Sequence, residues 1–161
     1  MKSRVKFFEA SLTRRSAMLS GAAFLFVGCA QAAEEQAVTV YKDARCGCCS
    51  IWIQHLQSNG FVTKTINATN VDALKSQFGV PADLATCHTA QIAGYVVEGH
   101  VPAAAIKRLL LEKPKATGLA VPGMPAGSPG MEGDRPVRYD VVLFGPTGRR
   151  TYMSFVGDQQ V

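Results

Sequence analysis

From residue 38 onward, the pattern of apolar and polar positions predicts a strand followed closely by a helix. Residues 38–41 are β-branched or aromatic, as is typical of a strand. From residue 48 the apolar residues, which include Trp52 and Leu56, take up helical spacing. Asn59-Gly60 is a typical helix end, because glycine accepts the left-handed backbone found there. We therefore expect a strand at 38–41 and a helix at 48–59.

The same reasoning extends to residue 113. It predicts a strand at 61–66, a short helix at 71–78, a hairpin with arms at 90–97 and 100–101 around a tight turn at Glu98-Gly99, and a helix from Pro102 to about residue 113. The order is strand, helix, strand, helix, strand, strand, helix. With cysteines between the first strand and the first helix, this order is typical of a thioredoxin or glutaredoxin core. The predicted fold class is therefore α/β with a thioredoxin-like (glutaredoxin-like) core.

Residues 114–136 interrupt this pattern. The segment is rich in proline and glycine, has little apolar periodicity and contains Met124 and Met131. A structureless loop of this length inside a compact domain is usually functional or disordered. Two further strands are expected at 137–144 and 150–156. The core should therefore carry a Pro/Gly/Met-rich loop and a C-terminal β-hairpin extension.

Residues 1–32 have the features of a cleaved export signal. Five basic residues precede an uncharged, largely apolar run at 17–33 that is too short to span a bilayer comfortably. Arg14-Arg15 fits a twin-arginine signal, and an ordinary secretory signal is the alternative. Cleavage after Ala32 would release a soluble periplasmic protein, whereas a lipoprotein site would leave a lipid on Cys29. We favour the soluble form, and expect membrane contact only if Cys29 is lipidated.

Removing this signal changes the charge balance. Residues 1–32 hold five of the 17 lysine and arginine residues and one of the 12 acidic residues, so the rest of the chain carries 12 basic and 11 acidic residues. The high isoelectric point therefore comes from the signal and gives no support for a nucleic-acid partner. Residues 33–161 are enough for one compact domain, which we expect to be monomeric.

Four cysteines remain after the signal, three of them within Cys46-Gly47-Cys48-Cys49 and the fourth at Cys87. An exported protein usually uses cysteines in structural disulfides. That use fits poorly here, because the adjacent Cys48 and Cys49 cannot easily pair, and only one member of the cluster can reach Cys87 at a time. The spacing therefore favours a redox or metal site.

Cys46 and Cys49 have the spacing of a redox CxxC pair at the start of a predicted helix. Unpaired backbone N–H groups and the helix dipole favour thiolate there, and Arg45 adds a positive charge. A thiolate is both the nucleophile of disulfide exchange and a soft ligand for Cu(I). Cys46 and Cys49 are accordingly the candidate catalytic residues if the site is redox-active, and the pair alone does not distinguish the two uses.

Cys48 and the Cys87-His88 pair shift the balance towards metal binding. A third thiol would interfere with a disulfide exchanger, whereas a soft-metal site gains from another sulfur. In the predicted topology, Cys87 and His88 occupy the place where thioredoxin-like folds carry a proline beside the active site. Four sulfurs also suit zinc. The export signal, the imidazole of His88 and the methionine-containing loop favour copper, as Cu(I).

Three further side chains are candidate donors. Met124 and Met131 carry soft thioethers on a loop that could fold over the cysteines, although methionine more often fills apolar gaps. His100 follows the predicted hairpin turn, where a solvated histidine is equally consistent. On the first helix, we interpret His55 as a surface or packing residue and Trp52 as a core residue.

Taken together, these residues resemble the CopG-type periplasmic copper-resistance proteins, which are unrelated to the plasmid repressor of that name. The resemblance covers most of residues 33–161 and rests, in chain order, on Tyr41-Lys42, Cys46-Gly47-Cys48-Cys49, Cys87-His88-Thr89-Ala90, Glu98-Gly99-His100-Val101-Pro102, Gly118-Leu119-Ala120-Val121-Pro122-Gly123-Met124-Pro125 and Gly127-Ser128-Pro129-Gly130-Met131-Glu132. It implies a thioredoxin-like fold, a role in copper tolerance and copper ligation by Cys46, Cys48, Cys49 and Cys87. It also strengthens the case for His88, His100, Met124 and Met131 as ligands.

Three functions are compatible with these features. The first is periplasmic sequestration of Cu(I), with redox chemistry on the metal as an extension. The second is a thiol–disulfide oxidoreductase in which Cys46 attacks and Cys49 resolves. The third is a chaperone that delivers copper to an exported oxidase or an efflux pump. Whether the protein is an enzyme stays open at this point.

Overall fold

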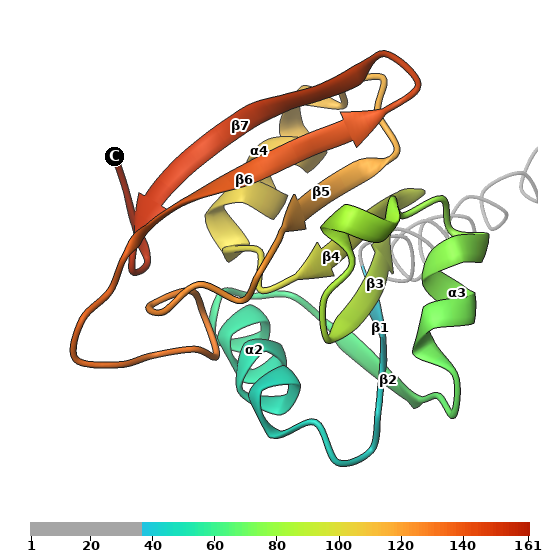
Figure 1. The fold of residues 1–161 in the computed structure, drawn as a ribbon, viewed down its shortest axis with the longest axis horizontal. Coiled ribbons are helices and arrows are strands. Elements are labelled where there is room, and N and C mark those ends of the chain that lie inside the picture. The colour runs from blue at the N-terminus through green and yellow to red at the C-terminus, as the bar shows by residue number, and fades with distance from the viewer. Residues whose placement is uncertain (1–36) are drawn as a thin grey trace, which may run out of the picture.

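The computed structural model describes residues 37–161, and the predicted export signal lies outside the described residues. The described chain is a mixed α/β domain with one eight-stranded sheet in the order β2-β1-β3-β4-β5-β6-β7-β8 (Figure 1). Its elements are β1 (Val38–Lys42), α2 (Gly47–Ser58), β2 (Thr63–Asn67), α3 (Val71–Gln77), the 3-10 turn η1 (Ala82–Leu84), β3 (His88–Ile92), β4 (Tyr95–Gly99), α4 (Ala103–Glu112), β5 (Gly118–Val121), β6 (Arg138–Gly145), β7 (Gly148–Val156) and β8 (Gln159–Gln160). The predicted α/β class, the predicted order up to α4 and the C-terminal hairpin are confirmed.

The helix that begins at the cysteine cluster forms for the reasons expected from the sequence. Its buried residues, Cys49, Trp52, Ile53 and Leu56, recur at helical spacing and form one apolar stripe. The helix ends where Asn59 donates its N–H to carbonyls of the last turn, and Gly60 follows with a φ of +89°. Because this stripe is buried in the core, it fixes the rotation of α2 about its own axis and therefore the direction in which its first turn faces.

The sheet carries apolar clusters on both faces. Leu56 of α2 and Ile106 of α4 belong to the larger cluster, and Leu84 of η1 belongs to the smaller one. Adjacent residues of β4 divide between them, with Val97 in the larger cluster and Val96 in the smaller, as the alternation of side chains along a strand requires. Within residues 37–161, no helix is long and apolar enough to cross a membrane.

The hairpin turn lies five residues earlier than predicted. The structure places it at Ala93-Gly94, between β3 and β4, whereas Glu98 and Gly99 belong to β4. Ala93 and Gly94 have φ values of +47° and +81°, the pair of positive angles that a two-residue hairpin turn favours. The prediction gave the turn to Glu98-Gly99, because an alanine in the left-handed region carries no signal in the sequence.

The predicted structureless loop at 114–136 contains a strand that the sequence analysis missed. β5 pairs parallel with β4 and antiparallel with β6, and all four of its residues are buried. Four residues show too little periodicity to identify a strand, and the flanking prolines and glycines concealed it. β5 therefore joins the core to the C-terminal hairpin in one continuous sheet.

Candidate metal centre

The cysteine cluster lies at the first turn of α2. Cys46 is the N-cap residue with an extended backbone, and its side chain makes no capping hydrogen bond. Cys46 and Cys49 form a disulfide with their Cα atoms 5.5 Å apart, and Cys48 Sγ lies 3.6 Å from Cys46 Sγ. Among the described cysteines, Cys48 and Cys87 are free thiols. The CxxC pair is thus held at a helix N-terminus in its oxidised form.

The register of the sheet brings Cys87 to this turn. β1 and β3 pair antiparallel with Lys42 opposite His88, so the chain that leaves β1 runs beside the chain that enters β3. Cys87 immediately precedes β3 and therefore meets the cluster that follows β1. The four sulfur atoms of Cys46, Cys48, Cys49 and Cys87 all lie within 4.8 Å of one another. The convergence expected from the sequence is present.

Cys87 also belongs to a second group of ligand atoms. Its sulfur lies 3.3 Å from His88 Nδ1 and 3.1 Å from His100 Nε2, and the three residues form a cluster able to hold a metal ion. His100 reaches this position because it follows β4, and the end of β4 lies beside the start of β3. Cys87 is therefore shared between a four-sulfur group and a sulfur–imidazole group.

The two imidazoles differ in how they are held. His100 Nδ1 donates a hydrogen bond of 2.7 Å to the carbonyl oxygen of Pro129, so Nε2 presents its lone pair to Cys87. His88 is fully buried against Trp52, with ring centroids 4.4 Å apart, and its Nε2 has no hydrogen-bond partner among residues 37–161. Trp52 donates in turn to the carbonyl of Val101, which fixes α2 against the chain after His100.

Burial determines the protonation states of Cys87, His88 and His100. It lowers the pKa of His88 to about 3, with smaller contributions from His100 and Lys75, and it also lowers the pKa of His100. Burial, together with the neighbouring Cys48, raises the pKa of the Cys87 thiol to about 12. Near neutral pH both imidazoles are therefore neutral, as metal ligands must be. Cys87 is protonated until a metal displaces the proton.

The loop that carries the methionines packs against the start of α2. A Cβ placed on Gly130 would lie 2.7 Å from the carbonyl oxygen of Cys48 and 3.0 Å from His100 Nδ1, so this part of the loop touches both ligand groups. Met131 follows directly and is half-buried, whereas Met124 is 39% exposed with a φ of +47°. Their roles as ligands stay predictions.

Two other side chains singled out from the sequence have partners of their own. The Arg45 side chain is exposed and donates from Nε to a carboxylate oxygen of Asp43, which partly neutralises the positive charge expected to act on the cysteines. His55 Nε2 accepts the N–H of Ala103 at 3.0 Å, so His55 connects α2 to the start of α4. This agrees with the prediction of a packing role for His55.

The sequence analysis missed a buried ion pair behind Cys87. Lys75 of α3 and Glu98 of β4 are buried, with Nζ and Oε1 3.4 Å apart. Burial raises the pKa of Glu98, and the N–H of Thr86 and the Lys75 ammonium oppose that shift. One signal was present, since Lys75 lies between Leu74 and Phe78 on the side of the short helix expected to be apolar. A lysine there needs a buried partner.

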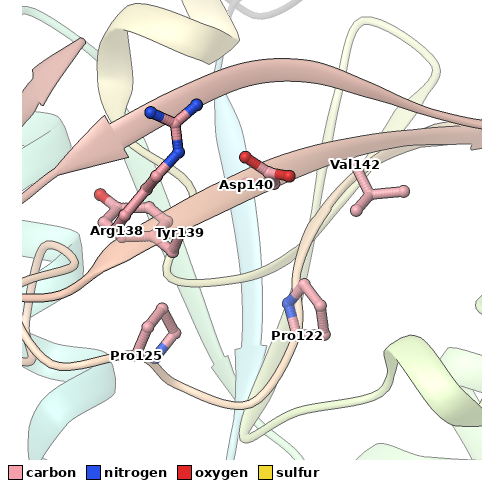
Figure 2. A pocket seen from close by; sticks show the side chains of 6 residues that line it. All are labelled: Pro122, Pro125, Arg138, Tyr139, Asp140 and Val142. Carbon is pink, nitrogen blue, oxygen red and sulfur yellow. The ribbon is translucent and has the colours of Figure 1, made fainter. Parts of the chain in front are cut away.

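A separate hollow of about 400 Å³ lies away from the cysteines, between the segment that follows β5 and the outer side of β6 (Figure 2). Arg138, Asp140 and Val142 alternate along the strand, and Pro122 and Pro125 face them. Its lining includes none of the predicted donors, so it is not part of the candidate metal centre.

The donor set fits a soft metal ion. Sulfur and imidazole are the ligands that copper and zinc share, and a set rich in thiolate favours Cu(I) or zinc over harder cations. In the disulfide form only two of the four sulfurs are thiols, so the full donor set requires the reduced protein.

Comparison with known proteins is consistent with this chemistry. Residues 84–131, which include Cys87, His88, His100 and both loop methionines, match a family model described as a protein of unknown function, DUF411. No curated protein sequence matches the chain significantly. Two solved structures, described as copper resistance protein CopG, Form 2 and Form 1, are each 47% identical with a TM-score of 0.70; the matches cover 74% and 75% of this chain and 97% and 98% of theirs. Because the identity is this high over nearly the whole of both structures, the chain belongs to the CopG family of copper resistance proteins.

Proposed function

We propose that the protein binds copper as Cu(I) through Cys46, Cys48, Cys49 and Cys87, assisted by His88 and His100. The observation that carries the proposal is the convergence of the four sulfurs within 4.8 Å, with Cys87 shared by two buried imidazoles. Zinc would accept the same atoms. The copper resistance function named for the two similar structures favours copper over zinc.

The Cys46–Cys49 disulfide gives the proposed site a redox dependence. Two electrons and two protons convert the disulfide into two thiols, and these thiols lose their protons on binding metal. The reduced protein then offers four sulfurs, whereas the oxidised protein offers Cys48, Cys87 and the two imidazoles. Met124 and Met131 are proposed as additional thioether donors on the loop beside the site.

We also propose that the domain has a thioredoxin-like core and is located in the periplasm. β1 lies between β2, which is parallel to it, and β3, which is antiparallel, and α2 follows β1 directly. A CxxC pair at the start of that helix supports a thioredoxin-like interpretation. The export signal expected at 1–32 would place this domain in the periplasm.

Metal analysis on protein reduced and loaded with Cu(I) in the absence of oxygen tests the function. The wild-type protein should retain one or more equivalents of copper after desalting, and Cys46→Ser and Cys87→Ser should each retain far less. Gln54→Ala, an exposed change on the same helix, is the control. Retention that is unchanged in both cysteine variants would rule out this site, and parallel loading with zinc would reveal a preference for that metal.

A second function, thiol–disulfide exchange on protein substrates, is favoured by one observation. The Cys46–Cys49 disulfide lies at a helix N-terminus, where the positive end of the dipole stabilises the thiolate released on reduction. In that reaction the reduced Cys46 thiolate attacks a substrate disulfide, one substrate sulfur leaves as a thiolate, and Cys49 then resolves the mixed disulfide. A Cys49→Ser variant should trap the mixed disulfide. Failure to trap any substrate, while copper is retained by the wild type, would favour metal binding alone.

A further inference from the structure

The residue that precedes Cys87 lies outside the sheet ladder. β3 begins at His88, so within the part of the chain that the structure describes no strand pairs with the backbone groups of Thr86. Buried backbone N–H and C=O groups nevertheless need hydrogen bonds. At Thr86 both groups are bonded by side chains from two different elements.

Those side chains are the buried ion pair. Glu98 Oε1 accepts the backbone N–H of Thr86 at 2.7 Å and its hydroxyl at 3.2 Å. Lys75 Nζ donates to the backbone carbonyl of the same residue and lies 3.4 Å from Glu98 Oε1. The carboxyl group of Glu98 is fully buried, and the Lys75 side chain is 4% exposed. Glu98 therefore accepts the N–H of Thr86, and Lys75 donates to its carbonyl.

The packing around Thr86 leaves little room for another arrangement. A Cβ on Gly99 would lie 2.5 Å from Thr86 Oγ1 and 2.9 Å from the carbonyl oxygen of Val121. The absence of a side chain at Gly99 thus allows Thr86 to approach β4 closely enough to reach Glu98.

We propose that Lys75 and Glu98 are positioning residues for the metal centre, which act through Thr86 to hold the Cys87 sulfur against the first turn of α2. Two opposed hydrogen bonds fix both the position and the orientation of the Thr86 peptide groups, and Cys87 is the next residue. This inference rests on the proposed copper function for one of its readouts, and on thiol proximity alone for the other.

A double variant, Lys75→Met/Glu98→Leu, separates positioning from stability. Replacing a buried ion pair with apolar residues of similar size is often neutral or stabilising, so the fold should persist while Thr86 loses both partners. Cu(I) affinity, measured anaerobically by competition with a chromophoric chelator, should fall about 10-fold to 100-fold, the range found when outer partners of metal ligands are removed. Asp83→Asn, which breaks the exposed pair with Arg149, is the matched control and should leave the affinity unchanged.

A measurement without metal tests the positioning role of Lys75 and Glu98 independently of copper binding. In a chain with Cys29, Cys46 and Cys49 changed to serine, the oxidant diamide should couple Cys48 to Cys87, because their sulfurs lie within 4.8 Å. The diamide takes up two electrons and two protons as the disulfide forms. Coupling should be slower when the double variant is added. If the wild type binds no Cu(I), the proposed function fails, and this coupling rate still decides the positioning role.

Conservative variants complete the test. Glu98→Gln keeps an oxygen that accepts the Thr86 N–H, so it should retain more copper than Glu98→Leu. If circular dichroism shows that the double variant is unfolded, Lys75→Met/Glu98→Gln removes the donor to the Thr86 carbonyl without leaving an unpaired buried charge, and should lower both readouts. A folded variant with wild-type affinity and wild-type coupling rate would overturn the proposal.

Discussion

His100 connects two parts of the site because its two ring nitrogens have different partners. Nδ1 is held by the carbonyl of Pro129 in the loop after β5, and Nε2 faces the sulfur of Cys87 at the start of β3. Such a bond on the far nitrogen fixes both the tautomer and the orientation of a metal-binding histidine. The loop therefore contributes to the site through a backbone carbonyl, whether or not its methionines bind metal.

Replacing His100 with glutamine should weaken copper binding without abolishing the fold. The glutamine amide cannot replace both ring nitrogens, one at the Pro129 carbonyl and one at the Cys87 sulfur, with the same geometry. It is also a poorer ligand for a soft metal than imidazole. We expect a loss in Cu(I) affinity of at least about tenfold, equivalent to about 1.4 kcal/mol. Chelator competition measures it, and His55→Gln, on the same side of the core but outside the donor group, is the control. Equal affinities in the two variants would remove His100 from the ligand set.

Gly130 is the residue at which the loop touches the helix, and it tolerates no side chain. Its φ is +88°, and an added Cβ would lie 2.7 Å from the carbonyl oxygen of Cys48 and 3.0 Å from the backbone nitrogen of Trp52. Gly130→Ala should cost about 1–3 kcal/mol of stability from backbone strain and should also lower copper retention. Thermal melting and metal analysis on the same samples provide the two measurements. Gly133→Ala, which has open space and no positive φ, should change neither.

At the scale of elements, the sequence predicted those whose periodicity is long enough to be read locally. α2 followed from its apolar stripe, and the meeting of Cys87 with the cysteine cluster was expected from the predicted thioredoxin-like order of elements. In the structure, the antiparallel contact between β1 and β3 produces that meeting. The turn at Ala93-Gly94 was misplaced because its conformation is imposed by the two paired strands. β5 was missed because four buried residues among prolines and glycines become a strand only between β4 and β6.

The cysteine and histidine side chains that converge at the candidate site were predicted from the sequence, whereas the residues that hold them in place were not. Sulfur and imidazole donors identify themselves by residue type. The Lys75–Glu98 pair and the Pro129 carbonyl act through tertiary contacts between elements distant in sequence, and no local pattern specifies which backbone group they bind. A charged residue on an apolar helix stripe is the one local clue to such a pair.

Gly118 lies in β5 where this strand pairs with β4. A Cβ on Gly118 would lie 1.9 Å from the carbonyl oxygen of Val96, so the parallel contact between β4 and β5 requires glycine there. Gly118→Ala should destabilise the protein by at least about 1–3 kcal/mol, the usual cost of overpacking, because the neighbouring atom is backbone and cannot turn aside. Urea unfolding measures the change. A stability within about 0.5 kcal/mol of wild type would mean that β5 is not tightly held between its neighbours.

Across the whole molecule, the candidate centre lies where several chain segments meet at one end of the sheet. The end of β1, the start of α2, the start of β3 and the end of β4 all supply or orient a donor. β6, β7 and β8 extend the sheet sideways, beyond β5 in the strand order. Metal binding should therefore connect elements that are far apart in the chain, and its free energy should appear in the stability of the entire fold.

Thermal unfolding of the reduced and oxidised forms tests this coupling. A ligand that binds only the folded state stabilises it by RT ln(1 + [L]/Kd), which is about 2.7 kcal/mol at a concentration 100-fold above Kd. Reduced protein should therefore melt several degrees higher when Cu(I) is added anaerobically. Protein with the Cys46–Cys49 disulfide has lost two sulfur donors and should show a smaller rise.

The rise in melting temperature on adding Cu(I) must be compared within each redox state, because the disulfide itself changes the melting temperature. Thiol counting after the scan verifies that the redox state was kept, and equal rises in the two forms would mean that Cys46 and Cys49 contribute nothing to copper binding.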